Sequence, residues 1–372
     1  MKIRTIDTHN KRDVKRFIQF PFELYKNHPC WVPPLIGDMQ FNLDRSRHPF
    51  YQHSDGELFI AESEGQVLGR IAVLHNIHHN EYQNRKTSFF CYFDVIEDLQ
   101  VARALFKAAF AWSEQRGLTE ITGPRGLLRS DGTGLLVHGF EHRAAMGLPY
   151  NYPYYDPFVI DSGFEKLNDH YSGYILSDFE LPSEVYKVAD MVMERKGYWI
   201  KTFDSKKELW QWVPRIGELF NTSFASGRDF YPVTEQEFAV IAQNLISVSD
   251  PRLIKLVMKG EVIIGFILAY PDIGEALQKI KGRLYPFGWL TLLRAQKTTR
   301  RLNLNGIGLL PEYQGLGGTT LLYVELYKTG KPLGYEYAET IQVDEDNFLS
   351  KSEHSHMKVT FHKTHRSYLR RL

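Results

Sequence analysis

The chain has 372 residues, of which 43% are hydrophobic and 24% charged, and its net charge at pH 7 is +1. This composition is typical of a globular protein and gives no general reason to expect nucleic acid or an anionic surface as partner. The length favours two domains, and two cysteines, Cys30 and Cys91, are too few for a disulfide framework.

Membrane and secretion signals are weak in the sequence. No apolar run approaches the roughly 20 residues that a membrane span needs. Residues 1–17 are basic but lack the apolar core of a signal peptide. We therefore expect a cytoplasmic protein with no membrane partner.

The first 122 residues alternate strand and helix patterns. They predict a strand and a helix within 1–26, then a hairpin of strands 57–62 and 67–74, and last a strand, a helix and a strand at 88–95, 101–115 and 118–122. Between the strand at 88–95 and its helix lies Glu97-Asp98-Leu99-Gln100, which has no glycine. Its two carboxylates would repel a phosphate group.

Residues 124–164 form a long connection rich in glycine and tyrosine, including Gly132, Gly134, Asp131 and Tyr154-Tyr155. Loops of this length are either functional or packed by their own side chains. We keep both interpretations: an acceptor-shaping segment at 130–155, or an aromatic structural loop.

From about residue 178 the pattern restarts. A helix is predicted at 183–196, a strand at 199–203, a helix at 208–224, another after Thr234, and a hairpin of strands 253–258 and 262–270. This order follows that of the first half and indicates a tandem pair.

An insertion then separates residue 275 from the next strand. Seven basic residues flank the apolar run 284–290, namely Lys279, Lys281, Arg283, Arg294, Lys297, Arg300 and Arg301. One interpretation is a solvated basic rim with an aromatic anchor; the other is a lid over a phosphate-bearing ligand or a site for an anionic surface.

The most informative stretch is 302–326, LNLNGIGLLPEYQGLGGTTLLYVEL. It predicts a strand, a glycine-rich turn and a helix. Such a turn directs several backbone N–H groups to one place, where the helix N-terminus adds positive potential for a phosphate. No Lys-Ser or Lys-Thr follows the last glycine, which excludes a Walker P-loop, and GxGxxG is not matched.

This turn resembles motif A of the GNAT acetyltransferases, Gln/Arg-x-x-Gly-x-Gly/Ala. Gln314 and Gly317 match, whereas Thr319 stands where Gly or Ala is usual. A strand at 337–343, then Glu345-Asp346-Asn347, then a closing strand at 361–368 also resemble the family. Two positions depart from it: His354 replaces a tyrosine, and Lys358-Val359 replaces Gly-Phe.

The resemblance implies an α+β (mixed α/β) fold of two tandem GNAT-like domains, each a largely antiparallel twisted sheet flanked by helices. We place a degenerate domain at 1–178 and an acyl-CoA-binding domain at 179–372. The implied reaction is transfer of an acetyl or short acyl group from acetyl-CoA, or another acyl-CoA, to the amine of a small molecule.

The resemblance also implies the site residues. His354 is the candidate general acid, and Glu339 or Asp344 the candidate base. The cofactor-binding residues are Ile307, Gly308, Leu309, Leu310, Gln314, Gly315, Leu316, Gly317, Gly318, Thr319 and Asn347.

Two other functions stay open. A Fem-like aminoacyl transferase would use aminoacyl-tRNA and touch it with the basic insertion, although the neutral charge leads us to expect no nucleic acid. A non-catalytic protein could bind CoA only as a structural or sensing ligand. The histidines near 75–79 and 354–365 lack the spacing of a zinc site, so we expect no metal. The sequence does not indicate an oligomeric state.

Overall fold

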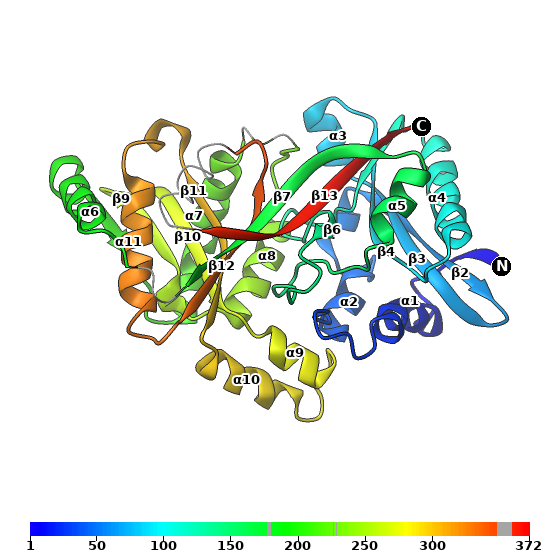
Figure 1. Ribbon diagram of the computed structural model, residues 1–372. Helices are drawn as coiled ribbons and strands as arrows, with labels where there is room; N and C mark the ends of the chain where they lie inside the picture. The colour runs from blue at the N-terminus through cyan, green and yellow to red at the C-terminus, as the bar shows by residue number, and fades with distance from the viewer. Residues whose placement is uncertain (177–179, 226, 228, 348–358) are drawn as a thin grey trace.

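One twisted sheet runs through the whole molecule and carries helices on both faces (Figure 1). The computed structural model describes residues 1–176, 180–225, 227, 229–347 and 359–372. These residues form a sheet of thirteen strands in the order β1-β2-β3-β4-β5-β13-β7-β12-β11-β10-β9-β8, with β6 beside β13.

The first half follows the expected order of strands and helices. Its elements are β1 (Lys2–Thr5), α1 (Lys11–Leu24), α2 (Ile36–Asn42), β2 (Asp55–Ser63), β3 (Gln66–His75), α3 (Ile77–Gln83), β4 (Thr87–Val95), α4 (Leu99–Glu114), β5 (Glu120–Gly123), β6 (Leu135–His138), α5 (Tyr155–Asp161) and β7 (Glu165–Leu176). The sequence did not predict α3, which begins where Asn76 accepts a hydrogen bond from the His79 N–H.

The second half repeats this order. Its elements are α6 (Ser183–Lys196), β8 (Tyr198–Lys201), α7 (Lys206–Ser223), α8 (Glu235–Val248), β9 (Lys255–Lys259), β10 (Val262–Pro271), α9 (Gly274–Ile280), α10 (Gly288–Thr298), β11 (Arg301–Leu309), α11 (Gly318–Gly330), β12 (Tyr337–Asp344) and β13 (Thr360–Arg371). α8 begins where expected because Thr234 and Glu237 form a capping box. The insertion forms α9 and α10.

The two halves exchange their last strands. β13, the last strand of the chain, pairs antiparallel with β5 of the first half, where Tyr368 faces Gly123. β7, the last strand of the first half, pairs with β12 of the second, where Tyr337 faces Leu176. β7 and β13 lie side by side at the centre (Figure 1). Each half therefore depends on a strand from the other.

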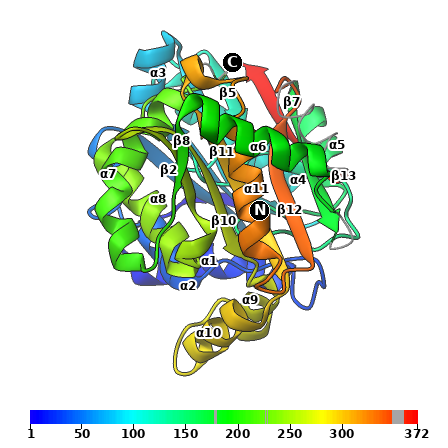
Figure 2. The same ribbon diagram turned by 90° about the vertical axis from the view of Figure 1, so that its left-hand side faces the viewer.

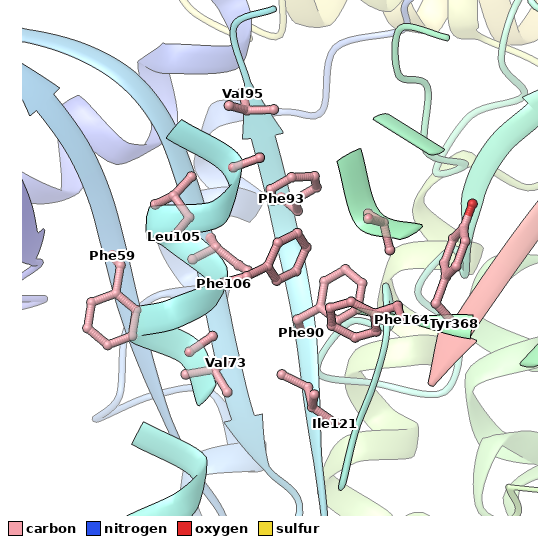
Figure 3. Packing of buried hydrophobic residues seen from close by; sticks show 14 of the residues in the cluster. Phe59, Val73, Phe90, Phe93, Val95, Leu105, Phe106, Ile121, Phe164 and Tyr368 are labelled. Atoms are coloured by element: carbon pink, nitrogen blue, oxygen red, sulfur yellow. The ribbon is translucent and has the colours of Figure 1, made fainter. Parts of the chain in front are cut away.

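The cores confirm this exchange. In the first half, α4 packs Phe106 against Phe90 and Phe93 of β4, and Leu105 and Tyr368 belong to the same cluster (Figure 3). In the second half, Leu321, Leu322 and Val324 of α11 are fully buried on one face of the sheet. Burial of each such side chain contributes about 1.5–3 kcal/mol to folding.

The fold class expected from the sequence is confirmed: a mixed α/β architecture of two GNAT-like units. The boundary expected between 178 and 179 lies outside the described residues and stays a prediction. The sequence did not predict β7 or the exchange of last strands.

Candidate functional site

Strands β11 and β12 are paired over only part of their lengths. Their parallel pairing runs from Arg301 opposite Tyr337 to Leu304 opposite Thr340. Beyond this point β11 keeps pairing with β10 as far as Leu309, while β12 continues along β7. Within the described residues, no strand pairs with the β12-facing edge of β11 after Leu304. Its backbone groups can hydrogen-bond an extended ligand.

The glycine-rich turn leads from this edge to the N-terminus of α11. Pro311–Tyr313 forms one 3₁₀ turn, and Gly315 (φ 71°) and Gly317 (φ 92°) have left-handed conformations. A Cβ on Gly317 would lie 2.4 Å from Cγ2 of Val192 in α6, which crosses α11 (Figure 2). Both the backbone conformation and the packing therefore require glycine at 317.

The N-terminus of α11 is capped by Gly317 and receives no side-chain hydrogen bond. The first backbone hydrogen bond to the Gly317 carbonyl comes from Leu321, at 3.1 Å. The N–H groups of the first turn consequently point out of the helix end, where the helix dipole favours an anion. Thr319, the departure from motif A, is the second residue of the helix and is partly exposed.

The structure thus brings most of the predicted cofactor-binding residues into one continuous surface. Ile307, Gly308 and Leu309 lie on the unpaired half of β11, Leu310 follows them, and residues 314–319 surround the start of α11. Asn347 follows β12 and donates its backbone N–H to the Asp344 carbonyl. His354 lies outside the described residues.

Next to the place where the strands part lies a buried polar cluster: Asn303, Glu339, His362 and Lys363. All four are at most 8% exposed. Asn303 and Glu339 face each other one residue before the end of the parallel pairing. Nζ of Lys363 lies 2.6 Å from Oε1 of Glu339, and Nε2 of His362 lies 3.6 Å from the same oxygen.

The connection 124–164 closes this cluster from the first half. Lys363 donates from Nζ to the Arg143 carbonyl at 2.9 Å. The Arg143 guanidinium makes two hydrogen bonds to the Asp272 carboxylate, at 2.6 and 3.2 Å. Thr133 exchanges backbone hydrogen bonds with the Gln342 side chain on β12. The connection is therefore ordered and touches the site.

The environment sets opposite protonation states for two cluster members. Burial raises the pKa of Glu339, but the nearby His362 ring and the Lys363 charge outweigh this, so its pKa lies below the usual value. Burial lowers the pKa of His362 despite the nearby Glu339 carboxylate. At neutral pH the pair is a carboxylate beside a neutral imidazole, which can accept a proton.

Asp344, the other predicted base, has different neighbours. Its carboxylate accepts a hydrogen bond from Nδ2 of Asn168 at 2.5 Å and lies 3.9 Å from Nδ1 of His170, both on β7. The structure does not bring it together with Glu339 in the buried polar cluster.

The sequence by itself does not single out His362 and Lys363 as site residues. Strict alternation would place these neighbours on opposite faces of β13. The pairing with β7 shifts register between Phe361 and Lys363, and this irregularity lets both side chains be buried. The sequence offers no clear signal here, because every residue from 362 to 367 is polar or charged and these two do not stand out among them.

Known proteins resemble this chain in sequence and in fold. No protein-family model matches it. Protein YghO of Escherichia coli (strain K12) is 31% identical over 308 residues, 82% of this chain and 78% of that protein. A protein of Caulobacter vibrioides named bacterial ceramide synthase is 27% identical over 98% of this chain and 97% of its own.

Among solved structures, a tandem GNAT protein from the clavulanic acid biosynthesis pathway has a TM-score of 0.58 at 12% identity and covers 100% of this chain and 98% of its own. A GCN5-related N-acetyltransferase from Sphaerobacter thermophilus has a TM-score of 0.52 at 13% identity, over 100% of this chain and 95% of its own. At these identities the likeness concerns the fold.

Proposed function

The chain belongs to the family of protein YghO and has the tandem GNAT fold, and from this premise we propose that it is an acyl-CoA-dependent N-acyltransferase. The observation that carries the proposal is the continuity of three features: the unpaired edge of β11, the Gly317-capped end of α11, and the buried polar cluster. Together they match an extended, phosphate-bearing donor whose reactive end meets a proton acceptor.

In this proposal the donor is held by backbone groups. The N–H groups of Gly315 and of residues 317–319 bind the pyrophosphate with the help of the helix dipole. The edge from Ile307 to Leu310 hydrogen-bonds the amides of the pantetheine arm as an added strand would. Asn347 contacts the same arm. A donor bound in this way supplies the activated thioester.

The buried polar cluster then prepares the acceptor amine. The neutral imidazole of His362 removes a proton from the amine. The Glu339 carboxylate stabilises the imidazolium that forms, and Lys363 holds Glu339 in place. Glu339 is thus a positioning residue rather than the base, since its ion pair weakens its own basicity. His354 stays our candidate acid for the leaving thiolate, and Asp344 the alternative base.

An apolar pocket beside β11 bears on the size of the acyl group and of the acceptor. A pocket of about 110 Å³ lies beside the paired part of β11, and Leu181, Leu302, Leu304, Tyr323 and Leu326 are among its lining residues. Ceramide is an N-acylated long-chain amine, and the relative with that name matches nearly the whole chain. We infer a donor chain longer than acetyl and an apolar amine acceptor.

Donor binding is tested by thermal unfolding with CoA, acetyl-CoA, octanoyl-CoA and palmitoyl-CoA. A ligand at 100 times its Kd stabilises the native state by about 2.7 kcal/mol, which is readily measured. We expect every thioester to raise the melting temperature and the longer chains to act at lower concentration. If none shifts the transition at millimolar concentration, the proposal fails.

Turnover is tested by release of free thiol with a panel of amines that includes long-chain bases. His362→Gln should lower kcat by about 100-fold or more, whereas His138→Gln, an exposed histidine on β6, should not. Because the base must be neutral, the wild-type rate should fall as pH drops through a pKa below 6.5. The variant should lack this acidic limb.

These measurements also separate the alternatives. CoA binding without turnover on any amine would favour the non-catalytic reading. Turnover that requires aminoacyl-tRNA in place of acyl-CoA would favour the Fem-like one.

A further inference from the structure

The insertion between β10 and β11 carries the most exposed aromatic residues of the described chain. It folds into α9 and α10 and projects below the sheet (Figures 1 and 2). Five large apolar side chains form its tip, which we call the hairpin tip: Tyr285 (83% exposed), Phe287 (71%), Trp289 (45%), Leu290 (48%) and Leu293 (47%). Large apolar side chains that are this exposed and grouped within residues 285–293 indicate an interaction site.

The hairpin is held firmly against the body of the protein. Leu277 and Leu292 are buried in a shared core, and Gln278 donates from Nε2 to the carbonyls of Pro29 and Trp31 at 2.8 Å. The Gly282 carbonyl accepts a hydrogen bond from the Ile36 N–H at 3.0 Å. The exposed side chains are thus presented outward from a supported base.

The charges around the tip have one sign. Five basic side chains surround it, namely Lys279, Lys281, Arg283, Arg294 and Lys297, all exposed. Within the described part of the chain, none of the five forms an ion pair. Glu275 is the one acidic residue from 274 to 298. The insertion therefore presents exposed aromatic and aliphatic groups together with basic side chains that form no ion pair within the described residues.

We propose that the hairpin tip docks this protein onto the surface of an anionic lipid bilayer. Aromatic and leucine side chains enter the interface between headgroups and acyl chains, and lysine and arginine attract anionic headgroups. A second copy of the chain fits poorly, since a two-fold interface would place the same cations opposite each other. Single-stranded RNA could contact the basic and aromatic side chains, but it would leave the exposed Leu290 and Leu293 without a function.

This docking is peripheral. No helix in the described ranges is long and apolar enough to cross a membrane. α10 has 11 residues, which at 1.5 Å per residue span about half of the roughly 30 Å hydrocarbon core. The expectation of no membrane partner was drawn from the absence of a spanning segment and does not address such a contact. The inference is independent of the acyltransferase proposal.

The test is co-flotation of the full chain with phosphatidylcholine vesicles that contain either no phosphatidylglycerol or one quarter of it. We expect binding to the anionic vesicles, reduced at least tenfold by 0.5 M NaCl and at least tenfold by Tyr285→Ser with Phe287→Ser. Lys281→Glu with Arg283→Glu should reduce it similarly. The control is Tyr82→Ser on α3 with Val262→Ser on β10, both 53–54% exposed, which should bind like the wild type.

Melting temperature and donor binding should be unchanged in the tip variants, which shows that they fold. A wild-type chain that stays unbound on anionic vesicles, or tip variants that bind as well as the wild type, would overturn the proposal. A chain that does not float but forms a dimer, lost on substitution of the tip, would assign the surface to a second copy instead.

Discussion

Helices α4 and α11 occupy equivalent positions in the two halves, and their N-termini differ in chemistry. Each follows a strand that pairs in parallel with the next strand of its half, β4 with β5 and β11 with β12. Asp98 caps α4 and accepts the Gln100 N–H at 2.8 Å, whereas Gly317 begins α11 without a side-chain cap. A carboxylate already occupies the N-terminal end of α4, whereas the end of α11 is left open for an anion such as the phosphate of our proposal.

The end of β4 and the corresponding edge of β11 also differ, and again the second half is the more open. In the first half, the Tyr155 hydroxyl accepts the Val95 N–H at 2.8 Å, and the Tyr154 hydroxyl donates to the Val95 carbonyl at 2.8 Å. Tyrosines from the connection 124–164 thus satisfy the end of β4. The corresponding edge of β11 has no strand partner within the described residues. In the first half, tyrosine side chains hydrogen-bond the backbone at the end of β4. In the second half, the β12-facing edge of β11 beyond Leu304 has no strand partner within the described residues.

The interior pairs differ as well. In each half we compare the residue pair just before the last pair of the parallel ladder. In the first half this pair is Ser88 opposite Ile121, and in the second half it is Asn303 opposite Glu339. Ile121 belongs to a hydrophobic core, whereas Glu339 belongs to the buried polar cluster. Under our proposal the chemistry takes place in the second half, and the following substitutions test this division.

The largest effect is expected from Glu339→Gln. It leaves Lys363, 1% exposed, without its carboxylate partner, which should lower the free energy of unfolding by about 3 kcal/mol or more. Urea denaturation measures this. Because Glu339 has a lowered pKa, its contribution is present above the unfolded value near 4.5 and is lost as pH falls through the folded value.

The control for this substitution is the double variant Glu339→Gln with Lys363→Met. Without a stranded charge it should be more stable than the single variant. If the single and double variants had the same free energy of unfolding, the loss of the ion pair would not explain the destabilisation caused by Glu339→Gln.

A smaller effect is expected from Thr319→Glu, which adds a negative charge at the second residue of α11. An acidic residue in the first turn suits the helix, so folding should be retained while CoA affinity falls by tenfold or more. The matched variant is Gln100→Glu, at the second residue of α4, which should leave CoA affinity unchanged. Isothermal titration calorimetry distinguishes them. Weaker binding in Gln100→Glu alone would mean that the donor sits in the first half.

The smallest effect is expected from Tyr155→Phe. It removes the hydroxyl that accepts the Val95 N–H and hydrogen-bonds Tyr25 at 2.9 Å, and should cost about 1–2 kcal/mol of unfolding free energy. CoA affinity should stay as in the wild type, with Tyr82→Ser as a surface control. A change in affinity without a change in stability would contradict a purely structural role for Tyr155.

The sequence by itself determined the local features of this protein. The glycine-rich turn at 311–318, the helix after it and both hairpins follow from side-chain periodicity and turn residues that act within a few positions. The carboxylates at 97–98 likewise predicted that the N-terminus of α4 would repel a phosphate. These features depend on neighbours along the chain, and so they could be inferred without knowing the fold.

The tertiary structure alone decided which strands meet at the centre. A strand pattern such as 360–371 states which side chains can share a face, but its backbone can pair with any suitable edge. Only the exchange of β7 and β13 places His362 and Lys363 beside Glu339, which lies 23 and 24 residues earlier in the chain. The same holds for the insertion. Its composition allowed a solvated rim, a lid or a site for an anionic surface, and the packing of its base against residues 29–36 leaves its aromatic residues exposed.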